Sequence, residues 1–231
     1  MLHLYFTQMD TPPADVYAQL TAKGWQVAHL PFRHTVFYDV SLEVLASDVI
    51  ILTSKQAVRW LMARYPNCTN RLAVVGESSA SLVPRQQLLF DEAPANAEEL
   101  VCKLRQRLTT ETTLLFLRGR KARDTISKAL APFGLRELVV YGTEKILENR
   151  SAPVKPAMVY FQAPGTVVDY MEAFQVPPER VGAIGPSTAE ALQQVGWHVD
   201  FQPPRPENTH FAAALPAPDE WVTQIKPRIE Q

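Results

Sequence analysis

Short apolar runs bounded by turn residues recur along the whole chain. They are nearly continuous rather than alternating, which is typical of strands that helices cover on both faces. They therefore predict buried parallel β-strands. The runs lie at 2–6, 25–30, 48–53, 72–76, 114–117, 137–141, 158–162 and 181–185, and a further candidate lies at 197–201.

Segments with helical character separate these runs. They carry apolar residues at helical spacing, and several begin directly after a strand and its turn. Because strand and helix alternate throughout, the sequence predicts an α/β protein with parallel sheets. The predicted helical segments are 13–24, 55–65, 79–83, 97–108, 123–134, 165–174 and 187–196.

Part of this pattern occurs twice. The segment DVIILTSKQAV from Asp48 resembles AMVYFQAPGTV from Ala157, and LAVVGESSASL from Leu72 resembles VGAIGPSTAEA from Val181. Both matches have the same offset, since 157 − 48 = 109 and 181 − 72 = 109. Two ungapped matches at one offset indicate a duplicated unit.

A weaker match extends the repeat to the rest of the chain. The segments that begin at Leu4 and Leu115 resemble each other and are called x1 and x2. The repeated segments that begin at Asp48 and Ala157 are called y1 and y2, so the chain has the order x1, y1, x2, y2. A unit x supplies two strands and a unit y up to three, which predicts two five-stranded, flavodoxin-like domains. Either each x joins the y that follows it, or x1 joins y2 around an inserted domain of y1 and x2.

The inserted arrangement has a further consequence for two segments between the units. The chain would cross between domains near 31–40 and 141–153. Both crossings contain β-prone residues, and two such segments side by side could pair as a ladder. The residues alone leave both arrangements open.

Composition limits the class of protein. The chain has 231 residues, 46% hydrophobic and 20% charged, as in a soluble globular protein of one or two domains. A formal net charge of −1 argues against a general nucleic-acid binder. No apolar run approaches the roughly 20 residues of a membrane span, and no signal peptide precedes the first strand. We therefore expect a cytoplasmic protein without a membrane partner.

The cysteines and histidines do not indicate a metal site. Cys68 and Cys102 are too few and too far apart for a disulfide framework or a zinc site. No HxxxH or HxH spacing occurs among the histidines, and no GxGxxG follows a strand. We expect neither a metal nor a nucleotide cofactor.

Candidate binding residues follow the strands, because ligands of open parallel sheets bind at the carboxyl ends of the strands. The loops there are small, hydroxylated or basic, and most precede a helix whose N-terminus attracts anions. Equivalent loops of the two halves could face one another across one cleft. The candidates are Thr7, Thr53, Ser54, Lys55, Gly76, Ser78, Ser79, Arg118, Gly119, Gln162, Ala163, Gly185, Ser187 and Thr188.

Several of these residues also have a purely structural interpretation. Ser78, Ser187 and Thr188 could act as N-caps, a role worth about 1 kcal/mol. Arg118 belongs to the basic stretch LRGRKARDT, which could be a solvated turn or a carboxylate-binding loop.

The C-terminal run from Val181 to Leu215 resembles the signature of the uroporphyrinogen-III synthase family. It contains a strand, a Gly-Pro-hydroxyl-hydroxyl turn, a helix and a proline-rich loop. The resemblance continues through DVIILTSKQAV, VVGESSASLV, LLFLRGRKARDTISKAL followed by VVYGTE, and MVYFQAPGTVVDYM. The order and spacing of these segments carry the resemblance, since each one alone is only loosely defined.

The resemblance implies two flavodoxin-like domains joined by a two-stranded β linker. One domain would combine 1–35 with 150–231, and 36–149 would form the inserted domain. The implied activity is the conversion of hydroxymethylbilane, a linear tetrapyrrole received from hydroxymethylbilane synthase, into uroporphyrinogen III. The reaction loses water, closes the macrocycle and inverts the last pyrrole ring, and the resemblance implies a monomer without a cofactor.

The resemblance also assigns roles to individual residues. Tyr141 matches the family's tyrosine, which could assist departure of the hydroxyl, and Ser187 and Thr188 match the hydroxyl residues of the Gly-Pro turn. The chain departs from the family at Gln8 and Gly142, where arginines are usual, and at Gln162-Ala163, where the family has Thr-Ser. Two basic contacts to substrate carboxylates are therefore missing from these loops.

Two other functions fit the same residues. A noncatalytic two-lobed module could bind a small anion or a tetrapyrrole without converting it. Another cleft enzyme on tandem flavodoxin-like domains would need a cofactor motif that the sequence lacks. An assay with hydroxymethylbilane distinguishes them.

Overall fold

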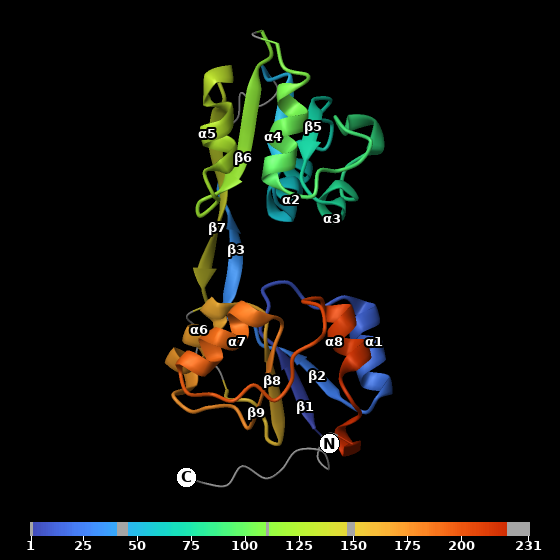
Figure 1. Ribbon diagram of the computed structural model, residues 1–231, viewed down its shortest axis with the longest axis vertical. Helices are drawn as coiled ribbons and strands as arrows, with labels where there is room; N and C mark the ends of the chain where they lie inside the picture. The colour runs from blue at the N-terminus through green and yellow to red at the C-terminus, as the bar shows by residue number, and fades with distance from the viewer. Residues whose placement is uncertain (1, 41–45, 110, 147–150, 221–231) are drawn as a thin grey trace. The chain divides into compact units, whose positions relative to one another are not determined.

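The computed structural model describes residues 2–40, 46–109, 111–146 and 151–220 (Figure 1). The chain forms two compact units: unit 1 combines Met1–His34 with Lys145–Gln231, and unit 2 is Thr35–Glu144. The first division lies one residue from the predicted boundary at 35. The other predicted boundary, at 149–150, lies outside the described residues.

Unit 1 contains a parallel sheet in the order β2-β1-β8-β9. β1 pairs with β8, which joins unit x1 to unit y2. The crossed arrangement is therefore the one observed. The strands are β1 (His3–Phe6), β2 (Gln26–His29), β8 (Ala157–Phe161) and β9 (Arg180–Ala183), and the helices are α1 (Ala14–Ala22), α6 (Pro164–Phe174), α7 (Pro186–Gln194) and α8 (Asn208–Ala214).

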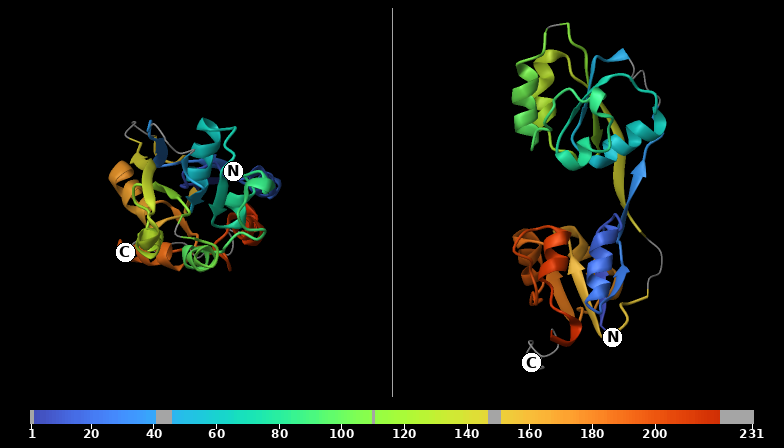
Figure 2. Two further views of the ribbon diagram at one scale, coloured as in Figure 1. Left: turned by 90° about the horizontal axis from the view of Figure 1, so that it is seen from above. Right: turned by 90° about the vertical axis from the view of Figure 1, so that its right-hand side faces the viewer.

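Successive residues of β8 belong to two different cores. Met158 and Tyr160 pack with α1 and α8, whereas Val159 and Phe161 pack with α6 and α7. Helices thus cover both faces of the sheet, α6 and α7 on one side and α1 and α8 on the other (Figure 1; Figure 2 gives two further views). This explains why the strand sequences are apolar without alternation, and it confirms the α/β prediction.

The predicted strand at 197–201 is wrong in extent, because only an isolated parallel bridge between Gly182 and Phe201 forms there. The Asp200 side chain accepts a hydrogen bond from the Val181 backbone N–H at 2.7 Å, where a strand would use its main chain. Pro203 and Pro204 follow and carry no backbone N–H to continue the ladder. Helix α8 was not predicted.

Unit 2 contains a sheet in the order β3-β7-β6-β4-β5. β4 pairs in parallel with β5 and β6, and β6 with β7. The predicted helix at 79–83 is shorter and begins earlier, as α3. The strands are β3 (Arg33–Phe37), β4 (Val49–Leu52), β5 (Arg71–Val74), β6 (Leu114–Gly119) and β7 (Arg136–Lys145), and the helices are α2 (Lys55–Arg64), α3 (Glu77–Ala80), α4 (Ala97–Arg105) and α5 (Thr125–Leu130).

The strands of unit 2 divide their side chains between two cores in the same way. Ile50 and Leu52 pack with α2, whereas Val49 and Ile51 pack with α4 and α5. Trp60 of α2 is buried, and its indole N–H donates to the Tyr38 carbonyl at 3.0 Å.

The internal repeat is reproduced in strand register. Val49 lies opposite Arg71 in the first copy, and Met158 lies opposite Arg180 in the second. Both partners keep the sequence offset, since 158 − 49 = 109 and 180 − 71 = 109. The duplication inferred from sequence is therefore a duplication of strand-helix-strand geometry.

β3 and β7 are antiparallel neighbours that carry the chain between the units. The Tyr38 N–H donates to the Val140 carbonyl at 2.9 Å, and the Ile146 N–H donates to the Phe32 carbonyl at 2.9 Å. The partner numbers have a constant sum, 38 + 140 = 32 + 146 = 178, so the register between the two bonds is continuous. This is the predicted two-stranded linker.

Candidate functional site

A hollow of about 300 Å³ opens in unit 2 where several strands end and helices begin. Thr53 and Ser54 follow β4, and Val75 follows β5, because parallel strands bring their carboxyl ends to one edge. Three predicted site residues, Thr53, Ser54 and Tyr141, line this hollow. The full lining is Thr53, Ser54, Val75, Asn96, Ala97, Glu98, Phe116, Ala122, Arg123, Thr125, Ile126 and Tyr141.

The Tyr141 phenol is held by the start of a helix. Its O–H donates to Ser54 Oγ at 2.9 Å, and Ser54 Oγ accepts from the Ala57 backbone N–H at 3.2 Å. Ser54 therefore caps α2 and orients the phenol at the same time. The position of the phenol oxygen is thus fixed by a residue that helix formation holds in place.

Gly119 makes room for the Tyr141 ring. A Cβ atom on Gly119 would lie 2.6 Å from Tyr141 Cζ, closer than real contacts allow. The register between β6 and β7 also shifts at Arg118 and Gly119, which brings Gly119 opposite Tyr141. The predicted site residue Gly119 thus acts through close approach.

Arg118 is engaged by its own neighbours. Its guanidinium donates to Glu137 at 2.6 Å, Ser127 at 3.0 Å, the Ala122 carbonyl at 2.6 Å and Asp124 at 3.2 Å. The hydrogen bond to Glu137 raises the pKa of Arg118 although burial opposes this. Arg118 therefore organises the loop after β6, a role that its place in a basic stretch did not reveal.

The other predicted residues of unit 2 lie around the start of α2 and α3. Lys55 is exposed at the first position of α2. Gly76 has φ of 80° and is the N-cap of α3, and its N–H donates to the Pro94 carbonyl. Ser78 is exposed and Ser79 buried within α3. Among the described residues, none of these four lines the hollow beside Tyr141.

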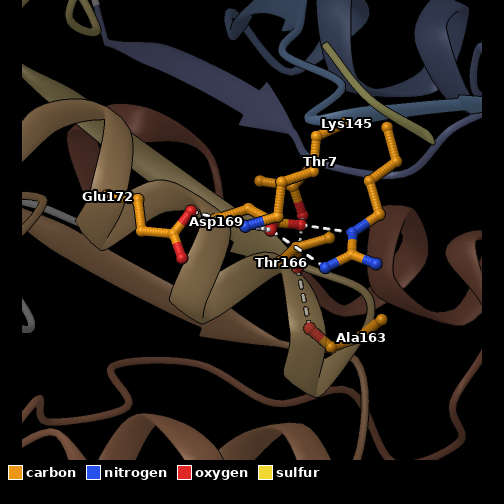
Figure 3. Close-up of polar contacts among 7 residues, drawn as sticks. Thr7, Lys145, Ala163, Thr166, Asp169 and Glu172 are labelled. Atoms are coloured by element: carbon orange, nitrogen blue, oxygen red, sulfur yellow. Dashed lines mark hydrogen bonds and ion pairs between the residues drawn. The ribbon is translucent and has the colours of Figure 1, made fainter. Parts of the chain in front are cut away.

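In unit 1, the ends of β1 and β8 are joined through side chains. The Thr7 backbone N–H donates to Gln162 Oε1 at 3.0 Å, and the Thr7 hydroxyl lies 3.1 Å from Gln162 Oε1 and 3.3 Å from Thr166 Oγ1. Thr166 donates to the Ala163 carbonyl at 2.7 Å, as Figure 3 shows. Thr7, Gln162 and Ala163 thus share one edge of the sheet, as expected.

The remaining predicted residues begin α7. Gly185 is its N-cap and has no side chain to fill that role, while Ser187 is exposed and Thr188 is buried. Ser78, Ser187 and Thr188 all lie inside their helices rather than at the cap. The N-cap interpretation is therefore wrong for them.

Sequence reasoning missed several polar residues at these edges. Asn96 lines the hollow and caps α4, accepting from the Glu99 backbone N–H at 2.8 Å while Glu99 accepts from the Ala95 N–H at 2.8 Å. The spacing Asn-x-x-Glu before an apolar run is the sequence signal of a capping box, although Glu99 here accepts from Ala95, one residue before the N-cap Asn96. Asn208 donates to Gln8 Oε1 at 2.6 Å. No local pattern reveals that second contact, which links residues 200 positions apart.

The described ranges contain neither a metal-binding cluster nor a membrane-spanning helix. Within them, no three or more His, Cys, Asp or Glu side chains gather in a way that could hold a metal ion. No helix in the same ranges has the length and apolar character to cross a membrane.

Known proteins resemble the chain in sequence and fold. The uroporphyrinogen-III synthase of Schizosaccharomyces pombe is 30% identical over 115 residues, which is 46% of this chain and 44% of that protein. Uroporphyrinogen-III synthetase from Helicobacter pylori 26695 has a TM-score of 0.65 at 18% identity, covering 91% of this chain and 96% of that one. A mutant uroporphyrinogen III synthase from Thermus thermophilus has a TM-score of 0.52 at 15% identity, with 97% and 100% covered.

These likenesses differ in what they show. The aligned part spans less than half of the yeast relative, and the two solved structures share the fold at low identity. The family model described as uroporphyrinogen-III synthase HemD matches residues 15–213, most of the chain. With the crossed strand pairing and the tyrosine beside a strand-end hollow already in place, the chain belongs to the uroporphyrinogen-III synthase family.

Proposed function

We propose that the protein is an active uroporphyrinogen-III synthase, a lyase of haem biosynthesis. It would cyclise hydroxymethylbilane to uroporphyrinogen III with loss of water and inversion of ring D. Family membership supports the reaction class. The observation that carries the proposal for this chain is the Tyr141 phenol, oriented by Ser54 at a hollow where strands end and helices begin.

Substrate binding depends on many weak anion contacts. The substrate has eight carboxylates, so hydroxyls, backbone N–H groups at helix starts and selected basic side chains suit it. Thr53 and Ser54 beside the hollow, and Thr7, Ser187 and Thr188 in unit 1, are binding candidates on these grounds. The protein's main task is to fold a flexible chain so that the correct carbon attacks.

Tyr141 has a defined part in the chemical step. Departure of the terminal hydroxyl needs a hydrogen bond or a proton. The phenol O–H supplies it by turning from Ser54 to the hydroxyl, which leaves as water. The azafulvene that remains is attacked by a pyrrole carbon. The proton lost from the pyrrole carbon at which the macrocycle closes balances the one given to the hydroxyl.

A coupled assay tests the proposal directly. Hydroxymethylbilane synthase and porphobilinogen generate the substrate, and the oxidised product is separated into isomers I and III. Isomer III that increases with added protein supports the proposal. A protein that binds the bilane but leaves isomer I is the noncatalytic tetrapyrrole-binding module instead.

We further propose that the protein works as a cytoplasmic monomer and receives its substrate from hydroxymethylbilane synthase. Sedimentation at micromolar concentration tests the monomer, and cell fractionation tests the compartment. Direct transfer predicts that the ratio of isomer III to isomer I does not fall when the two enzymes are diluted together.

A further inference from the structure

Asp169 of α6 is a buried carboxylate that binds two cations. Its side chain is 3% exposed, and it faces Arg33 at the start of β3 and Lys145 at the end of β7. Arg33 Nε lies 2.5 Å from Oδ2 and Arg33 Nη2 lies 2.9 Å from Oδ1. Lys145 Nζ lies 3.3 Å from Oδ1 (Figure 3).

The geometry leaves half of the Arg33 guanidinium available. Asp169 takes Nε and one N–H of Nη2. The end-on fork, made of Nη1 and the second N–H of Nη2, has no further hydrogen-bond acceptor among the described residues. The side chain is 27% exposed, and the hydrogen bond to Asp169 raises its pKa, so the charge is permanent. An arginine held on one edge presents the other edge in a fixed direction.

Lys145 differs from Arg33 in how its charge is used. Its Nζ lies 2.5 Å from Glu172 as well as 3.3 Å from Asp169, and the hydrogen bond to Glu172 raises its pKa. The ammonium is therefore shared between two carboxylates. Lys145 provides a control cation that contacts the same aspartate.

The outer part of Arg33 lies against the first turn of α6. A Cβ atom on Gly165 would be 3.7 Å from Nη2, which is ordinary contact. Gly165 is the second residue of α6 and is exposed, as are Ala163 and Pro164 before it. The fork is thus next to the loop that follows β8, at the edge where the candidate residues Gln162 and Ala163 lie.

Gln162 has an unused donor at this same loop. Its Oε1 accepts from the Thr7 backbone N–H, which can only donate, so the orientation of the amide is fixed. Its Nε2 is buried and has no hydrogen-bond partner among the described residues. A buried amide N–H without an acceptor is unfavourable, and a ligand oxygen that reached it would supply the missing acceptor.

We propose that the Arg33 fork forms a binding subsite for a substrate carboxylate at the first turn of α6, next to the loop that holds the Gln162 amide. Asp169 is the positioning residue that orients Arg33. The subsite rests on the proposed function and supplies a guanidinium that the loops at Gln8 and Gly142 lack. The positive end of α6 adds to the attraction for a carboxylate.

Arg33→Lys is the first test. Lysine keeps the positive charge, but its single ammonium cannot form the paired contact with Asp169 and a paired contact with a substrate carboxylate at the same time. We expect about a tenfold higher KM with kcat changed less than twofold, as for a contact equal in ground and transition states. Asp169→Asn keeps the shape and loosens Arg33, and should raise KM about threefold, again with kcat unchanged. Lys145→Met is the control and should change KM less than twofold.

A second variant guards against a folding defect. Arg33→Met combined with Asp169→Leu removes both charges, so that no buried charge is left unpaired and Tm is retained. Its KM should rise as much as that of Arg33→Lys. Unchanged KM in both Arg33 variants, with normal wild-type turnover, overturns the subsite alone. Wild-type protein that leaves isomer I contradicts the proposed function and the subsite with it.

Discussion

At the scale of single residues, Tyr141 is constrained from two sides. Ser54 accepts its hydroxyl hydrogen bond, and Gly119 leaves the space that its ring fills. The phenol is therefore preorganised rather than free at a strand end. Each constraint can be removed separately, which makes the proposed role measurable.

Tyr141→Phe removes only the hydroxyl. We expect kcat to fall about a hundredfold, the scale of a lost general acid, with KM and Tm nearly unchanged. Ser54→Ala is the companion variant: it frees the phenol and removes the α2 cap, so it should lower both kcat and Tm. Unchanged kcat for Tyr141→Phe would remove Tyr141 from the chemical step.

Gly119→Ala introduces a methyl group where Tyr141 Cζ would be 2.6 Å away. The ring must move, so we expect kcat to fall although the phenol is still present. Because both changes act through one group, the double variant with Tyr141→Phe should be no slower than Tyr141→Phe alone. Additive losses in this cycle would show that Gly119 acts elsewhere.

Tyr160 carries a polar atom that the fold does not use. Its ring is buried and stacked on Phe211, with 3.6 Å between the ring centroids. Its hydroxyl has no hydrogen-bond partner among the described residues, and burial raises the pKa of this hydroxyl. Tyr160→Phe should therefore increase the free energy of unfolding by roughly 1 kcal/mol in urea denaturation. Tyr5→Phe is the control, because the Tyr5 hydroxyl accepts from the Val154 N–H and its loss should not stabilise the protein.

At the scale of elements, the loop between β6 and α5 is organised by Arg118. The guanidinium binds acceptors on β7, on α5 and within the loop itself. The side chain is 13% exposed. These contacts make it an anchor for the loop whose Ala122 and Arg123 line the hollow.

Arg118→Ala should therefore change stability first. Glu137 and Asp124 lose a charged partner, so we expect the free energy of unfolding to fall by roughly 1–3 kcal/mol. KM should rise through disorder of the loop, and calorimetry with kinetics separates the two effects. A rise in KM at unchanged Tm would instead support direct carboxylate binding by Arg118.

An element could be predicted from the sequence where it depends on neighbouring residues, and could not where it depends on residues far away in the chain. The strands and most helices are encoded locally, because burial on both faces demands apolar runs such as that around β8. The prediction of a strand at 197–201 was wrong because the Val181 N–H donates to the Asp200 side chain instead of to a main-chain carbonyl. Local residues could not choose between the two pairings of the repeat, since β1 meets β8 only through long-range contacts; the family resemblance decided it.

The candidate site was predictable to the same degree. Loop positions such as Ser54 and Gln162 follow from the rule for parallel strands, and Tyr141 followed from family resemblance. The buried partnership of Arg33 and Asp169 spans 136 positions and has no local signature. Its members come from a linker strand and a helix face that folding alone brings together.

At the scale of the whole molecule, the linker register offers a way to separate the units. The constant sum of 178 places His34 opposite Glu144. Joining these two residues by Asn-Gly, a two-residue hairpin turn, should remove residues 35–143, which is unit 2 except for Glu144, and close unit 1. We expect the product to unfold in one cooperative transition, and residues 35–144 made alone to do so as well, by circular dichroism. A product without a cooperative transition would mean that the units stabilise each other.

The pairing of β1 with β8 also sets an order of events during translation. His3 lies opposite Ala157, so 157 − 3 = 154 residues separate the partners. At ~5–20 residues per second, the ribosome needs roughly 8–30 s to make them. All of unit 2 is made during that interval, while β1 can pair with β2 but still lacks β8. On the nascent chain, the edge of β1 that later pairs with β8 therefore stays open until β8 has been made.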